Sequence, residues 1–171
     1  MKNILKFIFF VTVLTTTGFG SIASEQSQKL LNPGWSFKGF FGKFDRSSLQ
    51  RGYQVYTEVC AACHSMKYLS YRNLAQQGGP EFSEDQAKII ASQFEVIDGP
   101  NSEGDMFTRP ARLSDNFVGP YANEEAAKSA NGGAYPPDMS VLVKARKGGA
   151  SYIYSILLGY DDPPPDVSLE D

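Results

Sequence analysis

The stretch Val59-Cys60-Ala61-Ala62-Cys63-His64-Ser65-Met66 contains both cysteines and the single histidine of the 171-residue chain. A spacing of three residues places the two sulfur atoms on the same side of one helical turn. The histidine follows at once and can turn its imidazole toward that side. The thiol and imidazole chemistry of the chain is therefore concentrated in five consecutive positions.

Cys-x-x-Cys-His is the pattern that attaches c-type haem. Each cysteine sulfur can form a thioether with one vinyl group of the porphyrin, and the histidine can bind the iron from the same side. The pattern predicts Cys60 and Cys63 as the attachment sites of one haem and His64 as its proximal ligand.

Three other uses of the two thiols remain open on the residues alone. A disulfide is common in exported proteins with two cysteines. A thioredoxin-like dithiol normally begins a helix after a strand, whereas this pair follows a predicted helix. A structural zinc site needs four ligands, and the chain has no further cysteine or histidine to complete one.

The opposite face of the iron has no second histidine to bind it, so methionine, a weaker donor or solvent is expected there. Met66 lies two residues from His64, on the same side of the ring, and cannot reach around it. Met106 and Met139 are the candidates, although both positions are also typical of ordinary core or surface methionines.

The first 23 residues have the pattern of a secretory signal peptide, cut after about Ala23. Two lysines precede an apolar run at residues 7–14, which is shorter than the ~20 residues that cross a bilayer and so disfavours a retained anchor. Cleavage removes Lys2 and Lys6 and no acidic residue, so the formal net charge moves from -3 to -5. An acidic domain argues against a nucleic-acid partner and for a basic partner or simple solubility.

The rest of the chain, with 42% hydrophobic residues overall, is expected to form one mostly α-helical domain with long Pro- and Gly-rich connections. Residues 24–46 are interpreted as an extended aromatic arm that packs on this domain, and residues 47–171 as the domain itself. Nothing in the sequence alternates long enough to predict a sheet.

Capping signals predict where the helices of this domain begin. Ser47 or Ser48 is expected to cap a helix that carries Cys60. The other expected starts are a capping box at Ser83 and caps at Asn123 and Asp138, and a last helix is expected over residues 151–158, before Gly159.

Several motifs, in order along the chain, resemble the cytochrome c1 family. These are residues 51–56 (RGYQVY), 66–74 (MKYLSYRNL), 98–101 (DGPN), 132–138 (GGAYPPD) and 144–149 (KARKGG). The resemblance runs from about Trp35 to the last residue. It implies a cytochrome c-like fold with a single haem.

The resemblance also implies a site and a function. Cys60 and Cys63 would hold one covalently attached haem c, with His64 as an iron ligand, and further residues would line the haem. The implied role is a non-catalytic electron-transfer subunit of quinol:cytochrome c oxidoreductase. Its partners would be cytochrome b, the iron-sulfur subunit and a soluble cytochrome c, at the periplasmic face of a bacterial inner membrane. The haem-lining residues implied by the family are Asn131, Pro136, Pro137, Arg146 and Tyr152.

In the family, the distal methionine and a C-terminal membrane helix lie beyond the point that corresponds to residues 167–171. The chain is therefore expected to be a cytochrome c1 truncated by about a third, judged by the family outline. Two alternatives stay open: a non-redox remnant, or a soluble haem protein whose sixth iron position is open or taken by another residue.

Residues 81–105 are strongly acidic, with a net charge of -6. Such a patch would steer a basic electron acceptor, at a rate that falls as salt rises. A solvated face with no partner is the alternative reading.

Overall fold

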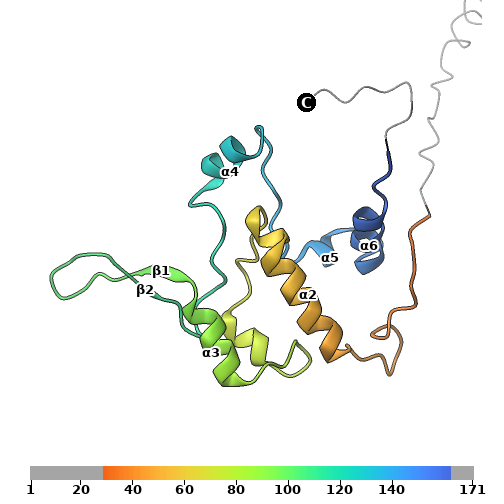
Figure 1. Cartoon of the computed structure of the whole chain (residues 1–171), viewed down its shortest axis with the longest axis horizontal. Helices are drawn as coiled ribbons and strands as arrows, with labels where there is room; N and C mark the ends of the chain where they lie inside the picture. The colour runs from red at the N-terminus through yellow and green to blue at the C-terminus, as the bar shows by residue number, and fades with distance from the viewer. Residues whose placement is uncertain (1–28, 163–171) are drawn as a thin grey trace, which may run out of the picture.

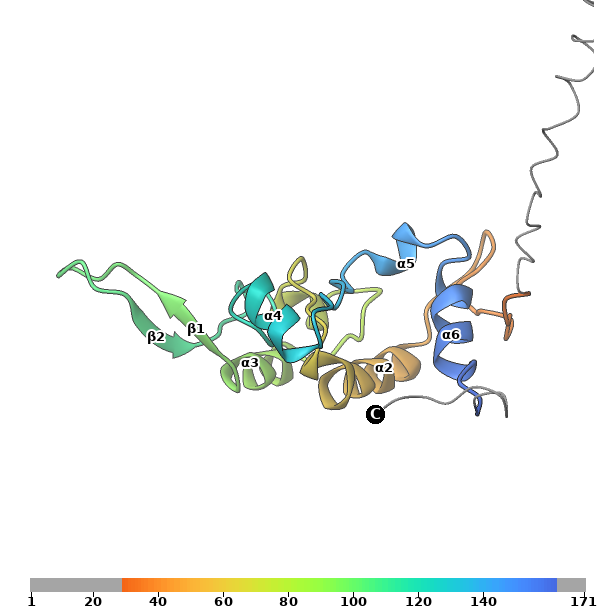
Figure 2. The same cartoon turned by 90° about the horizontal axis from the view of Figure 1, so that it is seen from above.

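The computed structural model describes residues 29–162, so the expected signal peptide, the start of the arm and the C-terminal residues 163–171 lie outside the described part. Helix α2 runs through the middle of the molecule, with a β-hairpin projecting on one side and α5 and α6 on the other (Figures 1 and 2). The mostly helical fold class is confirmed. The elements are α2 (Arg46–Glu58), η1 (Cys60–Ala62), η2 (Tyr71–Ala75), α3 (Glu84–Ser92), β1 (Glu95–Asp98), β2 (Phe107–Pro110), α4 (Glu124–Ala130), α5 (Leu142–Ala145) and α6 (Ala150–Leu158).

Helix α2 begins one turn earlier than its serines suggest. Asp45 is the N-cap, and its carboxylate accepts hydrogen bonds from the Ser48 amide and the Ser47 hydroxyl, both at 2.7 Å. The hydrogen bonds from Ser48 and Ser47 lower the pKa of Asp45 to about 2. The expected Ser47 or Ser48 cap is therefore wrong, because the helix already begins at Arg46 behind the Asp45 cap, which places both serines within its first turn.

The cysteine motif follows helix α2 but is not part of it. The α-helix ends at Glu58, and Cys60 opens a separate 3-10 turn, η1. The expectation that Cys60 belongs to this helix was wrong by two residues, because the backbone at Val59 leaves helical geometry. The prediction that the motif sits at a helix end is confirmed.

Three of the other helices begin or end where their signals indicate. Ser83 forms the expected capping box with Gln86 at the start of α3. Asn123 caps α4 by accepting from the Ala126 amide, and α6 ends at Gly159. These boundaries follow from local hydrogen bonding alone, which is why the sequence predicts them.

The expected cap at Asp138 is wrong. Helix α5 spans only Leu142–Ala145, and its N-cap position, Val141, makes no side-chain capping bond. The carboxylate of Asp138 instead binds a segment more than seventy residues earlier in the chain. A long-range partner thus competes successfully with the local helix end.

The buried core lies between α2, η2 and α3. Tyr71 is 1% exposed and stacks on Phe117 and Phe94, with ring centroids 4.8 Å and 5.5 Å apart. Ala87 and Ala91 of α3 are fully buried, and their small side chains let this helix approach η2 closely. The core therefore holds the segments on both sides of the cysteine motif.

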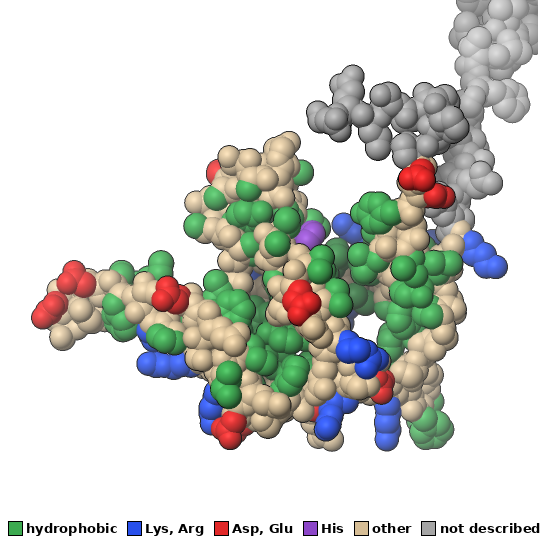
Figure 3. Space-filling view, viewed as in Figure 1, with side chains coloured by type: hydrophobic (Ala, Val, Ile, Leu, Met, Phe, Trp, Pro, Cys, Tyr) green, Lys and Arg blue, Asp and Glu red, His purple; other side chains and the backbone are tan. Residues whose placement is uncertain are grey.

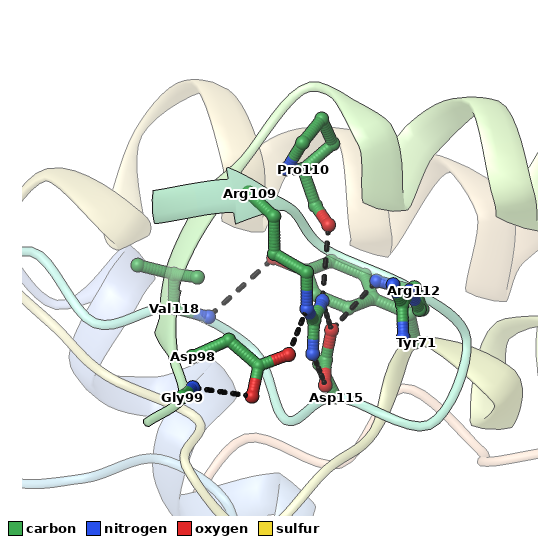
Figure 4. A network of polar contacts seen from close by, with 8 residues as sticks. All are labelled: Tyr71, Asp98, Gly99, Arg109, Pro110, Arg112, Asp115 and Val118. Carbon is green, nitrogen blue, oxygen red and sulfur yellow. Dashed lines mark hydrogen bonds and ion pairs between the residues drawn. The ribbon is translucent and has the colours of Figure 1, made fainter. Parts of the chain in front are cut away.

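The β1–β2 hairpin is the one sheet among the described residues, and the sequence did not predict it. It pairs antiparallel from Glu95 opposite Pro110 to Asp98 opposite Phe107. Arg109 joins the hairpin to the core, since its guanidinium contacts Asp98 on β1 and donates to Asp115 at 2.6 Å and 3.1 Å (Figure 4). The carbonyl of Asp115 in turn accepts from the amide of buried Tyr71.

Asp115 is the titratable group on which this attachment depends. Hydrogen bonds from Arg109 lower the pKa of its carboxyl to about 2, against partial burial, which raises it. A carboxyl with a lowered pKa stabilises the fold above its unfolded-state pKa, near 4, and loses that contribution as the pH falls through about 2.

We expect Asp115→Ala to lower the free energy of unfolding by about 2 kcal/mol at pH 7, the value that corresponds to this pKa shift. The difference from wild type should shrink between about pH 4 and pH 2. Urea unfolding followed by circular dichroism at several pH values measures both effects. Asp105→Ala, at an exposed loop position, serves as the control and should change neither. A loss that is the same at pH 2 and pH 7 would contradict the assignment.

Candidate functional site

The motif forms one tight turn in the structure. The carbonyl of Cys60 accepts hydrogen bonds from the amides of Cys63, at 3.1 Å, and His64, at 2.8 Å. Both cysteines are free thiols with partly exposed side chains. The turn thus presents two accessible thiols and the imidazole from one short piece of backbone.

The imidazole of His64 is oriented by a backbone carbonyl. Its Nδ1 lies 2.8 Å from the carbonyl oxygen of Pro137. Because a carbonyl can only accept, Nδ1 must carry the hydrogen, and the neutral ring then keeps a free lone pair on Nε2. A histidine whose other nitrogen is fixed in this way is the usual arrangement of a metal ligand.

Tyr56 of α2 supports the same residue from the core side. Its hydroxyl donates to the carbonyl of His64 at 3.2 Å. Burial raises the pKa of Tyr56 to about 12, so the phenol stays protonated and remains a donor. This contact joins the motif to the end of α2, a role that the sequence analysis missed. Helical spacing marked the residue only as apolar.

Asp138 ties the segment after the motif to the loop that carries Pro137. Its carboxylate accepts from the Ser65 hydroxyl at 2.7 Å, the Lys67 amide at 2.9 Å and the Ser140 amide at 2.9 Å. Partial burial raises the pKa of this carboxyl, but these hydrogen bonds outweigh it and bring the pKa down to about 2. Next to Asp138, the amide of Met139 donates to the carbonyl of Ser65 at 2.8 Å.

A cavity of about 410 Å³ opens beside the motif. The space-filling view shows the histidine, in purple, beside a notch between the part that carries α4 and the part that carries α5 and α6 (Figure 3). The cavity itself lies between residues 63–67, the segment 119–127 that leads into α4, and residues 135–136. Aromatic and proline side chains form part of the wall, together with small residues. The residues that line the cavity are Cys63, Ser65, Lys67, Gly119, Pro120, Tyr121, Ala122, Asn123, Glu124, Ala127, Tyr135 and Pro136.

Three of the lining residues implied by the family are placed around this site. Pro136 lines the cavity with Cys63. Pro137 supplies the carbonyl that orients His64. Asn131 does not line the cavity itself. Its side-chain amide donates to the hydroxyl of Tyr121, which does line it, at 3.1 Å.

The structure does not bring Arg146 and Tyr152 into this cavity. Arg146 is exposed at the end of α5, and no hydrogen bond or ion pair of its side chain is present among residues 29–162. Tyr152 lies on α6 and lines a separate hollow of about 460 Å³ with Leu30 and Ser155.

The two methionine candidates lie in different surroundings. Met139 is partly buried against the core, two residues after Pro137. Met106 is 61% exposed beside the hairpin strand β2. Met66 also packs against the core.

Comparison with known proteins identifies the family. The cytochrome C1 family matches residues 35–171. This chain belongs to the cytochrome c1 family. The match covers every motif from which the resemblance was drawn and the whole of the site described above.

Relatives within the cytochrome c1 family come from plants, bacteria and yeasts. Cytochrome c1 1, heme protein, mitochondrial, of Arabidopsis thaliana is 48% identical over 94% of this chain and 52% of its own length. Cytochrome c1 of Rhodospirillum rubrum is 50% identical over 90% of this chain and 55% of its own length. The cytochrome b-c1 complex catalytic subunit of Candida albicans is 50% identical over 77% of this chain. The chain spans about half the length of these relatives.

The site of this cytochrome c1 family member fits a c-type haem. Cys60 and Cys63 are partly exposed and accessible for thioether bonds, Nδ1 of His64 is bound to the Pro137 carbonyl so that Nε2 can bind a metal, and Cys63 lines a partly apolar cavity. In the described part of the chain, no group of three or more His, Cys, Asp and Glu is placed to hold a bare metal ion. Within residues 29–162, no helix has the length and apolar character that a membrane crossing requires.

We expect Asp138→Ala to loosen the connection between the segment after the motif, at Ser65 and Lys67, and the loop that carries Pro137. Hydrogen bonds to a charged acceptor contribute about 1.5–3 kcal/mol each, so protection of the Lys67 and Ser140 amides should fall about tenfold or more. Hydrogen exchange followed by NMR measures this. Amides of α3 are the internal control. Equal loss of protection in α3 would show a general destabilisation instead.

Proposed function

We propose that this chain is the c-type haem subunit of a quinol:cytochrome c oxidoreductase, receiving electrons from an iron-sulfur subunit and passing them to a soluble cytochrome c. The observation that carries the proposal is the single turn that holds Cys60, Cys63 and the oriented His64 together, with Cys63 in the wall of a cavity. The family adds support, since its relatives are named heme protein and cytochrome b-c1 complex catalytic subunit.

The residues of the chain have distinct tasks in this proposal. Cys60 and Cys63 hold the haem through carbon–sulfur bonds, and His64 offers Nε2 to the iron. The Pro137 carbonyl accepts from Nδ1 and so fixes the tautomer and the orientation of the ring. Pro136 and the aromatic side chains of the cavity wall would shield a bound haem from water. When bound, the haem supplies an iron that alternates between ferric and ferrous states.

The proposed place of this chemistry is the periplasmic face of a bacterial inner membrane, with cytochrome b and the iron-sulfur subunit as partners. The signal-peptide pattern of residues 1–23 supports export. The relative from Rhodospirillum rubrum supports a bacterial setting.

Haem attachment is tested by a denaturing gel. We expect the wild-type chain, produced with a haem-attachment system, to keep its haem stain after denaturation because thioethers survive it. Cys60→Ala together with Cys63→Ala should abolish the stain. Ser65→Ala, in the same cavity wall, should retain it and serves as the matched control. Absence of stain in the wild type would reject the proposal and favour a disulfide or a redox-active dithiol at Cys60 and Cys63.

The acidic segment separates into paired and unpaired carboxylates. Glu84 and Asp85 lie 2.8 Å and 3.5 Å from the ammonium of Lys88, and Asp98 is bound to Arg109. Glu103 and Asp105, at the hairpin tip, are exposed, and no ion pair involves them among residues 29–162. The carboxylates best able to steer a basic partner are therefore the exposed ones of the hairpin that lack an ion pair among residues 29–162: Glu95 on β1, and Glu103 and Asp105 at the tip.

We expect Glu103→Gln with Asp105→Asn to slow electron transfer to a basic cytochrome c several-fold at low ionic strength. The effect should vanish at high salt, because exposed charges are then screened within a few ångströms. Stopped-flow kinetics of the haem-loaded protein measures it. Glu84→Gln with Asp85→Asn removes the same formal charge from a position already paired with Lys88, so its effect should be smaller. Equal rates for wild type and the tip variant at low salt would exclude steering by the hairpin.

A further inference from the structure

Residues 35–44, the aromatic loop, form a closed structure before α2. The amide of Lys43 donates to the Ser36 carbonyl at 3.1 Å, and the Ser36 hydroxyl donates back to the Lys43 carbonyl at 3.0 Å. Gly39 has φ +96°, a conformation that favours glycine. A side chain at Gly42 would collide with the backbone of Phe37 at 2.4 Å. The loop is thus a tight, specified shape.

The aromatic rings of this loop divide into two groups. Trp35, Phe37 and Phe44 stack on one another, with centroids 5.4 Å and 4.8 Å apart. This inner group is fixed to α6, because the Trp35 indole donates to the Ser151 hydroxyl at 2.9 Å. It satisfies the expectation that the arm packs on the domain.

Phe40 and Phe41 form the outer group and do not pack on the domain. They are 95% and 88% exposed and contact each other edge to face, with centroids 4.9 Å apart. The expectation that the arm's aromatics pack inward is therefore wrong for these two, because the turn at Gly39 directs them away from the stack. Two fully exposed neighbouring phenylalanines on a closed loop indicate a surface that something apolar covers.

The charge around the loop points to the occupant. Residues 29–44 contain three lysines and no acidic residue, although the chain as a whole carries a net charge of -3. Figure 3 shows hydrophobic side chains beside blue basic ones at the lower right edge, where the loop meets α2 in Figure 1. Projecting aromatics flanked by lysines are typical of segments that enter the headgroup region of an anionic bilayer.

We propose that the aromatic loop is a contact with the surface of an anionic lipid bilayer, with Phe40 and Phe41 inserted among the headgroups and Lys38 and Lys43 near lipid phosphates. The loop ends at Asp45, the N-cap of α2, whereas the cysteine motif follows the other end of the helix. The 13 residues of α2 span about 20 Å. The bilayer contact and the cofactor site thus lie at opposite ends of one rigid element. The contact does not depend on the function proposed above.

Vesicle co-sedimentation of the full chain tests this contact. The wild type should bind vesicles of phosphatidylcholine with phosphatidylglycerol more strongly than vesicles of phosphatidylcholine alone. Phe40→Ala with Phe41→Ala should weaken binding about tenfold or more, because two rings lose their apolar burial. Ile97→Ala with Met106→Ala removes exposed apolar side chains from the hairpin region and should leave binding unchanged.

A lysine pair tests the electrostatic part separately. Lys38→Gln with Lys43→Gln should reduce binding to the anionic vesicles about 30-fold and leave binding to neutral vesicles unaltered. Lys144→Gln with Lys147→Gln, exposed at the far end of α5, is the matched control. All variants carry the same residues 1–28, so any binding by that segment is common to them.

Two results would overturn the proposal. One is equal vesicle binding by the wild type and the Phe40 and Phe41 variant, with circular dichroism showing that both are folded. The other is no vesicle binding by the wild type, which would indicate that the two rings fit a protein partner instead.

Discussion

The hydrogen bond between His64 Nδ1 and the carbonyl of Pro137 joins two parts of the chain that lie 73 residues apart. Without it, the imidazole could rotate and either nitrogen could carry the proton. With it, one tautomer is fixed and Nε2 is left available toward a ligand. The same two segments are also joined by the hydrogen bonds that Asp138 accepts from the Ser65 hydroxyl and the Lys67 amide, and by the bond from the Met139 amide to the Ser65 carbonyl. The geometry of the motif thus depends on a loop that lies near the other end of the sequence.

Helix α2 connects the aromatic loop with the cysteine motif. Its C-terminal end leads into the Cys60 turn, and Tyr56 fixes that turn through the carbonyl of His64. Its N-terminal end begins at Asp45, directly after the aromatic loop. Because an α-helix resists bending, the distance between these two regions is set by its length. The packing of Tyr56 and Tyr71 around Phe117 then holds the helix against η2 and α3.

The acidic segment shows why charge in a sequence differs from charge available to a partner. Asp98 belongs to a bridge with Arg109 and Asp115 that attaches the hairpin to the core. The carboxylates of α3 face a lysine one turn later. A partner would therefore meet chiefly the hairpin, at Glu95 and at its tip. Strand pairing between β1 and β2 and the spacing of side chains along α3 decide which carboxylates are paired and which are exposed. A count of charged residues carries no information about either.

The sequence by itself determined the chemistry of the site and one end each of helices α3, α4 and α6. The spacing of Cys60, Cys63 and His64 defines the motif, and the caps at Ser83 and Asn123 act within four residues, so both can be read locally. Only the tertiary structure decided which distant residues complete the site. It brought Pro137 to His64 and Asp138 to Ser65, and it left Arg146 and Tyr152 outside the cavity beside the motif. Those pairings depend on long-range packing and on competition for hydrogen bonds between distant segments, which no local pattern in the chain records.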